Sequence, residues 1–141
     1  MRLFIDTSVL LAACGSPDGG SRVVIDAAPL NGWSLIVNSW VLGETRRNVR
    51  KLSARAPLEW QSIRPRLNRV RNVLAIGKPV VFQPTKDRPV LLTAYEFADV
   101  LLTLDRRDFR ELLGGFFYHL RIQSPRDFLK WRRAEGAVML P

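Results

Sequence analysis

The sequence has 141 residues, of which 47% are hydrophobic and 9% aromatic, so it is suited to a packed globular domain and not to a disordered chain. Its 22 lysines and arginines outnumber 13 acidic residues, and the formal net charge of +9 favours a polyanionic partner. Cys14 is the single cysteine, which excludes an internal disulfide and a cysteine-based zinc cluster. His119, the single histidine, lies in an apolar, strand-like stretch and is expected to be structural.

Eighteen of the 22 basic residues are arginines. Arginine binds phosphate bidentately and stacks on bases, although a lineage bias towards arginine is an alternative explanation. No apolar run reaches the length of a membrane span. The start of the sequence has no signal-peptide pattern, so we expect a cytoplasmic protein without membrane attachment.

The first part of the chain alternates strand-like and helix-like segments. A short apolar run predicts a strand, and helical spacing of apolar residues after a capping residue predicts a helix. In chain order these criteria predict strand 2–6, helix 8–14, a helix from Ser21 to about Asn31, strand 33–37 and a long helix from 39 to about 52. The glycine-rich stretch 15–20 is expected to be a flexible loop.

The second part continues this alternation. Pro57 opens a helix in which apolar residues recur at steps of four, three and four up to Leu74, with a break or kink at Pro65. The later elements are expected as strand 80–82, helix 87–95, strand 100–104, helix 106–113, strand 118–122 and a helix after Ser124-Pro125. The apolar tail 137–140 has no assigned place and is a candidate for docking on a partner.

Strands that alternate with helices imply βαβ crossovers. We therefore predict an α/β fold with three layers, in which a mostly parallel five-stranded sheet is flanked by helices. We see no linker or internal repeat, so residues 1–141 are expected to form a single domain.

Four carboxylates lie where such a fold builds its sites. Asp6 and Asp105 follow the first and fourth predicted strands, so they emerge side by side if those strands are neighbours. Glu44 and Asp87, on the helices after the second and third strands, overhang the same edge. Each has a plain structural explanation, as a helix cap or, for Glu44, as an ion pair with Arg47. Together they would repel one another without a cation, and all-oxygen ligands suit Mg²⁺ or Mn²⁺.

At these residues the sequence resembles the PIN domain family (PilT N-terminus). The family's apolar strand into Asp-Thr-Asn/Ser corresponds to Phe4–Leu10, and its helical glutamate to Val41–Glu44. Its Asp-x-Pro-hydrophobic motif corresponds to Asp87–Leu91, and Ala-Asp-hydrophobic-Leu-x-Thr-x-Asp to Ala98–Asp105. The closing Thr/Ser-Pro-x-x-Phe-Leu corresponds to Ser124–Leu129. The motifs occur in the family's order over nearly the whole chain.

This resemblance implies a metal-dependent endoribonuclease, most often the VapC-like toxin of a type II toxin–antitoxin pair. It implies that the catalytic and metal-binding residues are Asp6, Glu44, Asp87 and Asp105, with Mg²⁺ or Mn²⁺ as cofactor. Ser8 and Thr103 are then expected to orient carboxylates or substrate. Arg46, Arg47 and Arg50 are candidates for contacts with RNA phosphates. The implied partners are RNA and a small antitoxin, with a homodimer possible.

Three other functions remain open at this point. The chain is alternatively a basic module of the same fold that binds RNA without cutting it, or a nuclease outside toxin–antitoxin systems. A phosphotransfer enzyme with Asp6 as nucleophile is disfavoured, because such enzymes usually carry a second acid two residues on, where this chain has Ser8.

Overall fold

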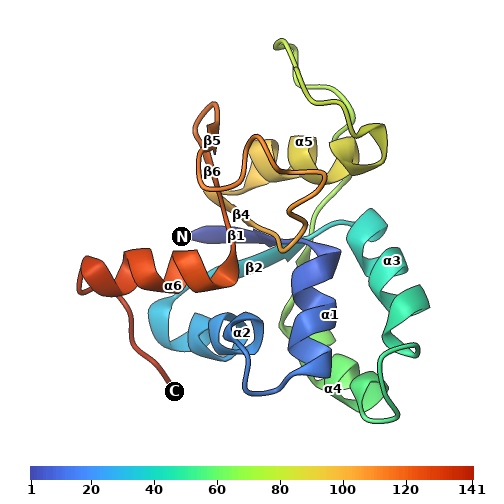
Figure 1. The fold of residues 1–141 in the computed structure, drawn as a ribbon, viewed down its shortest axis with the longest axis vertical. Coiled ribbons are helices and arrows are strands. Elements are labelled where there is room, and N and C mark those ends of the chain that lie inside the picture. Colours follow the sequence, from blue (N-terminus) through green and yellow to red (C-terminus); the bar gives the residue numbers. More distant parts are fainter.

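The computed structural model describes all 141 residues and contains one six-stranded sheet in the order β3-β2-β1-β4-β6-β5 (Figure 1). All neighbouring strands are parallel except β5 and β6. The strands are β1 (Arg2–Ile5), β2 (Ser34–Val37), β3 (Asn68–Arg69), β4 (Val100–Leu102), β5 (Phe116–Phe117) and β6 (Leu120–Gln123). The predicted mostly parallel α/β architecture is confirmed, with one strand more than expected.

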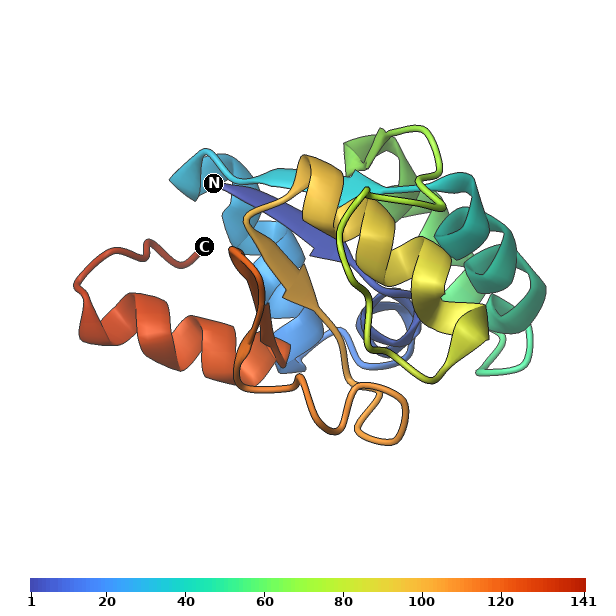
Figure 2. The same ribbon diagram turned by 90° about the horizontal axis from the view of Figure 1, so that it is seen from above.

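Helices cover both faces of this sheet and complete three layers. They are α1 (Thr7–Gly15), α2 (Gly20–Asn31), α3 (Ser39–Val49), α4 (Ala56–Ile63), α5 (Arg88–Phe97) and α6 (Pro125–Ala134), with two short 3-10 turns, η1 (Arg64–Arg66) and η2 (Thr85–Asp87). Figure 1 shows α5 above the sheet and α1, α2 and α4 below it, and Figure 2 shows the same layers from above. No helix has both the length and the apolar character to cross a bilayer.

The two strands that precede Asp6 and Asp105 lie side by side in the middle of the sheet. Ile5 at the end of β1 is in register with Leu102 at the end of β4, and both are fully buried. The backbone N–H of Asp6 donates to the carbonyl of Leu102 at 3.0 Å. The chain therefore leaves the sheet at the same edge after both strands, as predicted from the near-continuous apolar runs of a buried parallel sheet.

The segment 64–86 differs most from the sequence prediction. The helix after Pro57 ends at Ile63 instead of continuing to Leu74, because Pro65 has no N–H for a helical hydrogen bond. The chain then forms β3, which pairs with β2 at the edge of the sheet. No strand forms at 80–82. Pro79 and Pro84 flank this stretch, and the Val81 side chain is 87% exposed.

Four other elements also differ from the prediction. The predicted helix 106–113 is a series of turns, closed by the buried ring of Phe109 and by backbone bonds to Asp105. Helix α2 begins at Gly20 with Gly19 as its cap, so Ser21 is not the capping residue. Helix α3 ends at Val49 rather than near residue 52, and the fifth predicted strand begins at Leu120, after a turn in which Tyr118 has positive φ.

The apolar tail 137–140 packs against its own chain. Asn31 at the end of α2 donates to the carbonyl of Met139 at 2.7 Å and accepts from the Met139 N–H at 2.8 Å. Val138 packs against the core. His119, as expected, is a structural residue, with its ring 4.9 Å from that of Tyr95 and Nε2 3.3 Å from the Ala98 carbonyl.

Candidate functional site

Asp6 is the most firmly held of the predicted carboxylates. Its side chain is 5% exposed and caps α1, with Oδ1 accepting from the Thr7 N–H at 2.8 Å. Oδ2 accepts from the hydroxyls of Thr103 at 2.7 Å and Ser8 at 3.1 Å. Burial raises the pKa of Asp6 above its ordinary range, although these hydrogen bonds act to lower it, and the negative charge of Glu44 adds to the rise.

The same two hydroxyls connect Asp6 to the segment after β4. Ser8 Oγ accepts from the Leu104 N–H at 2.9 Å, and Thr103 Oγ1 accepts from the Asp105 N–H at 3.1 Å. Thr103 is completely buried. A small set of polar atoms thus fixes where the backbone carrying Asp105 leaves the sheet relative to Asp6.

Carboxylate oxygens of Asp87, Asp105 and Asp108 lie within 4.8 Å of one another. Asp105 Oδ1 accepts from the N–H groups of Arg107 at 3.1 Å and Asp108 at 2.9 Å, which folds the chain back so that Asp108 reaches the cluster. Asp108 was not among the predicted site residues. The spacing Asp-x-x-Asp after a strand was the available signal, but its geometry depends on this turn.

Asp87 has an unusual environment. It stands before α5, yet its side chain makes no capping hydrogen bond, and Oδ2 is buried without a partner. Burial, followed by the neighbouring Asp108 carboxyl and the charge of Asp6, raises the pKa of Asp87 to about 8. The pKa of Asp108 is lowered, first by its interaction with the Asp87 side chain and then by its ion pair with Lys86.

Lys86 supplies the positive charge nearest to the cluster. Its Nζ lies 3.2 Å from Asp108 Oδ2, and its side chain is 73% exposed. The hydrogen bond to Asp108, followed by the charges of Asp108, Asp87 and Asp105, raises the pKa of Lys86. No arginine forms an ion pair with any of the predicted carboxylates.

Glu44 lies on α3, is partly buried and forms no ion pair with Arg47 or any other residue. It acts on Asp6 through its charge and lies outside the close group of Asp87, Asp105 and Asp108.

Helix α3 is held relative to α5 by Asn38. This residue caps α3 through the Val41 N–H at 3.0 Å. It also donates to the Pro89 carbonyl and to Thr93 Oγ1, both at 3.1 Å. Asn38 therefore sets the position of the helix that carries Glu44 relative to the helix that begins after Asp87.

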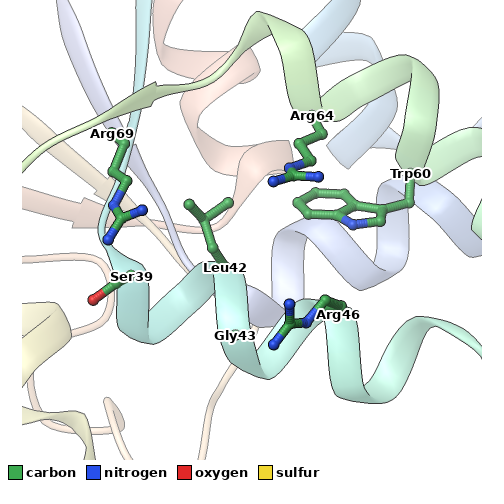
Figure 3. Close-up of a pocket in the computed structure, with 7 residues that line it drawn as sticks. All are labelled: Ser39, Leu42, Gly43, Arg46, Trp60, Arg64 and Arg69. Atoms are coloured by element: carbon green, nitrogen blue, oxygen red, sulfur yellow. The ribbon is translucent and has the colours of Figure 1, made fainter.

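The three predicted arginines are exposed and diverge along α3. Arg46 lines a cavity on the flank of the helix that faces α4 (Figure 3). Arg47 and Arg50 do not line it. The structure thus separates Arg46 from the other two.

One comparison with solved structures supports the fold. Over 88% of this chain and 98% of the other, the structure matches a chain in the crystal structure of VapBC2 from Rickettsia felis bound to a DNA fragment from their promoter, with a TM-score of 0.61 and 15% sequence identity. The chain has a PIN-like α/β fold. At this identity the likeness concerns the PIN-like fold alone. No family model and no curated protein matches the sequence.

The chemistry of the donors fits a hard divalent ion. Asp87, Asp105 and Asp108 all offer carboxylate oxygens, which Mg²⁺ and Mn²⁺ prefer, and no cysteine or histidine is present among them. The buried oxygen of Asp87 that has no hydrogen-bond partner would become a ligand of the ion. The residues present therefore suit a divalent metal ion.

Proposed function

We propose that this chain is a Mg²⁺- or Mn²⁺-dependent endoribonuclease that hydrolyses RNA phosphodiester bonds, and that it is the toxin of a type II toxin–antitoxin pair. The observation that carries the proposal is the buried, unpartnered oxygen of Asp87 within a cluster of carboxylates at the carboxyl edge of the sheet. The PIN-like fold and the net charge of +9 support a nucleic-acid substrate.

In this proposal Asp6, Asp87 and Asp105 hold the ion, Glu44 completes its surroundings through water, and Asp108 is an additional ligand. When bound, the ion supplies positive charge for the scissile phosphate and acidifies the attacking water. Ser8 and Thr103 donate to one oxygen of Asp6 and so hold its carboxylate in a single orientation.

The raised pKa of Asp87 couples metal binding to the release of a proton. Its pKa of about 8 means that the metal-free protein holds a proton between Asp87 and Asp108 at neutral pH. A cation that takes the Asp87 oxygen displaces this proton. Metal binding therefore releases a proton and strengthens as the pH rises.

The test is cleavage by the purified protein. We expect single-stranded or structured RNA to be cut with Mn²⁺ or Mg²⁺, and Asp105→Asn or Asp87→Asn to lower the rate by more than about a hundredfold. Asp18→Asn, in an exposed loop, is the matched control and should cut normally. Equal cutting by Asp105→Asn, or cutting in excess chelator, would rule the mechanism out.

The toxin assignment needs a separate test. The similar structure is of VapBC2 bound to DNA, and by analogy we propose a small antitoxin partner for this chain, with a homodimer as its own assembly. Purification of the tagged protein from its native host should recover a small protein in fixed ratio. If the active nuclease is recovered without a partner, the toxin assignment is wrong and the protein is a nuclease outside toxin–antitoxin systems.

A module that binds RNA without cutting it has one observation in its favour, since Lys86 already neutralises part of the acid cluster. That alternative predicts RNA binding without a metal requirement and without any cleavage. It also predicts that Asp6→Asn and Asp105→Asn leave binding unchanged and that no Mn²⁺ is retained, which calorimetry on the metal-free protein would measure.

A further inference from the structure

The cavity that Arg46 lines lies beside α3, and none of the clustered carboxylates lines it. It has a volume of about 200 Å³ and lies between α3, α4, η1 and β3. Ser39, Leu42 and Arg46 line it from α3, and their spacing of three and four residues places them on one side of that helix. Glu44 lies on a different side of α3, so the helix separates the cavity from this carboxylate.

Three guanidinium groups converge on this cavity. Arg46 comes from α3, Arg64 from η1 and Arg69 from the end of β3, and Figure 3 shows them around Leu42 and Trp60. None of the three forms an ion pair. Six other arginines of the chain form ion pairs, as Arg22 does with Glu59. Like charges brought together without a partner are relieved by an anion.

The remaining walls also suit an anionic group. Ser39 Oγ accepts from Asn72 Nδ2 at 2.8 Å, which leaves the hydroxyl hydrogen free to donate. Ser39 is the first residue of α3, so the positive end of the helix dipole lies on this side. Trp60 is only 7% exposed and forms a fixed wall.

The exposed ring of Trp40 favours a nucleic acid over other anions as the ligand of this cavity. It follows Ser39 on the first turn of α3 and is 44% exposed, although its indole is among the largest apolar groups. At 100° per residue, position 40 lies between the cavity side of α3 and the side of Glu44. An exposed aromatic ring between a cationic cavity and an acid cluster is suited to stacking on a base.

We propose that this cavity binds a backbone phosphate of an RNA strand at a distance from the scissile bond, with a neighbouring base stacked on Trp40. The inference rests on the proposed function. Asp6 follows β1, Ser39 follows β2 and Arg69 ends β3, in three adjacent strands. Strands lie about 4.8 Å apart, so the cavity is roughly 10 Å along the sheet edge from Asp6. One strand of RNA that crosses the first turn of α3 reaches both sites.

The test is binding of a labelled single-stranded RNA oligonucleotide in EDTA over a range of salt, followed by fluorescence anisotropy. Arg64→Gln/Arg69→Gln should weaken binding by roughly tenfold or more and lower the salt slope by about 0.7, the value for one lost phosphate on a single strand. Arg126→Gln/Arg133→Gln on α6 removes the same charge from exposed, unpaired arginines and should leave the slope unchanged. Thermal unfolding checks that each variant is folded.

Two further arms identify the ligand. Inorganic phosphate should compete with RNA more strongly than chloride at equal ionic strength, and only when Arg64 and Arg69 are present. Trp40→Ala should weaken RNA binding without changing the competition by phosphate.

Equal behaviour of the two double variants would overturn the proposal. So would displacement of RNA from the wild type by polyglutamate more effectively than by phosphate, since the occupant would then be an acidic protein. Because binding is measured without divalent ions, a failure here is separate from a failure to cleave RNA with Mn²⁺.

Discussion

The hydroxyl of Thr103 donates a 2.7 Å hydrogen bond to Oδ2 of Asp6, across 97 residues of sequence. Both groups are buried, so this bond is shielded from water. The same hydroxyl oxygen accepts from the Asp105 N–H. One threonine therefore connects two of the carboxylates to which we assign the metal ion.

Replacing this hydroxyl with a methyl group tests the connection. Thr103→Val keeps the shape of the side chain but leaves Asp6 and the Asp105 N–H with one bond fewer each. We expect a loss of about 1–3 kcal/mol in the free energy of unfolding and a roughly 10- to 100-fold loss in Mn²⁺-dependent cleavage. Thr103→Ser should recover most of the activity. A fully active, equally stable Thr103→Val protein would show that the bond has no role in the site.

Lys86 should compete with the metal ion. Its ammonium pairs with Asp108 at the edge of the cluster, and a cation bound there would displace or repel it. We expect Lys86→Met to raise the affinity for Mn²⁺ by about two- to fivefold, a small effect because the lysine is exposed. Calorimetric titration of the metal-free protein measures this, with Lys51→Met, in the turn after α3, as control. A weaker affinity would instead make Lys86 a contributor to the site.

The free energy of unfolding of the metal-free protein should fall as the pH rises from about 4 to 8. Asp87 has its pKa raised from 3.8 to about 8 in the folded protein, so in this window the folded state binds more protons than the unfolded state. The stabilising effect of that proton is complete below pH 4 and is lost as the pH passes through 8. The raised pKa of Asp6 acts in the same direction, while the lowered pKa of Asp108 acts only at lower pH.

Thermal unfolding in EDTA measures this dependence. The melting temperature should decline with pH in the wild type and in Asp18→Asn, and the decline should be smaller in Asp87→Asn. A wild-type curve that rises over the same window would mean that Asp87 is ionised in the metal-free protein. Saturating Mn²⁺ should reverse the trend, because the ion favours deprotonated ligands.

Asn38 should be a sensitive position for folding as well as activity. Its fully buried amide makes three hydrogen bonds that join the start of α3 to α5. We expect Asn38→Ala to lower the free energy of unfolding by about 2–4 kcal/mol, since each lost bond contributes about 1 kcal/mol and leaves buried groups unpaired. Urea denaturation measures the loss. Ser124→Ala, which removes a single capping bond from α6, should cost about 1 kcal/mol.

The parts of the fold that were predictable are those whose sequence reflects burial. The strands before Asp6 and Asp105 are apolar on both faces, so they are recognisable as buried strands of a parallel sheet, and their carboxylates are candidates for one edge if the two strands are neighbours, as the structure shows them to be. The segment 64–86 was mispredicted, because Leu67, Val70 and Leu74 keep a helical spacing while Pro65 prevents the helix. Leu74 is 73% exposed, which no local pattern indicates.

Other features depend on contacts that sequence spacing does not encode. Asp108 joins the cluster only through the turn that Asp105 closes with its own side chain. Arg46, Arg64 and Arg69 come from three elements, and β3 itself was not predicted, so their convergence was not foreseeable. The motifs of such a chain give the order of the carboxylates along the sequence, while the distances between them come from tertiary packing alone.

Because Asp6 begins α1 with one oxygen and accepts from the Thr103 and Ser8 hydroxyls with the second, an amide at this position would keep the helix cap and remove the negative charge. Asparagine accepts from the Thr7 N–H as aspartate does, so the helix would still start correctly. Such a protein, intact but without the charge, would be a natural reagent for trapping uncut RNA and seeing which nucleotides it selects.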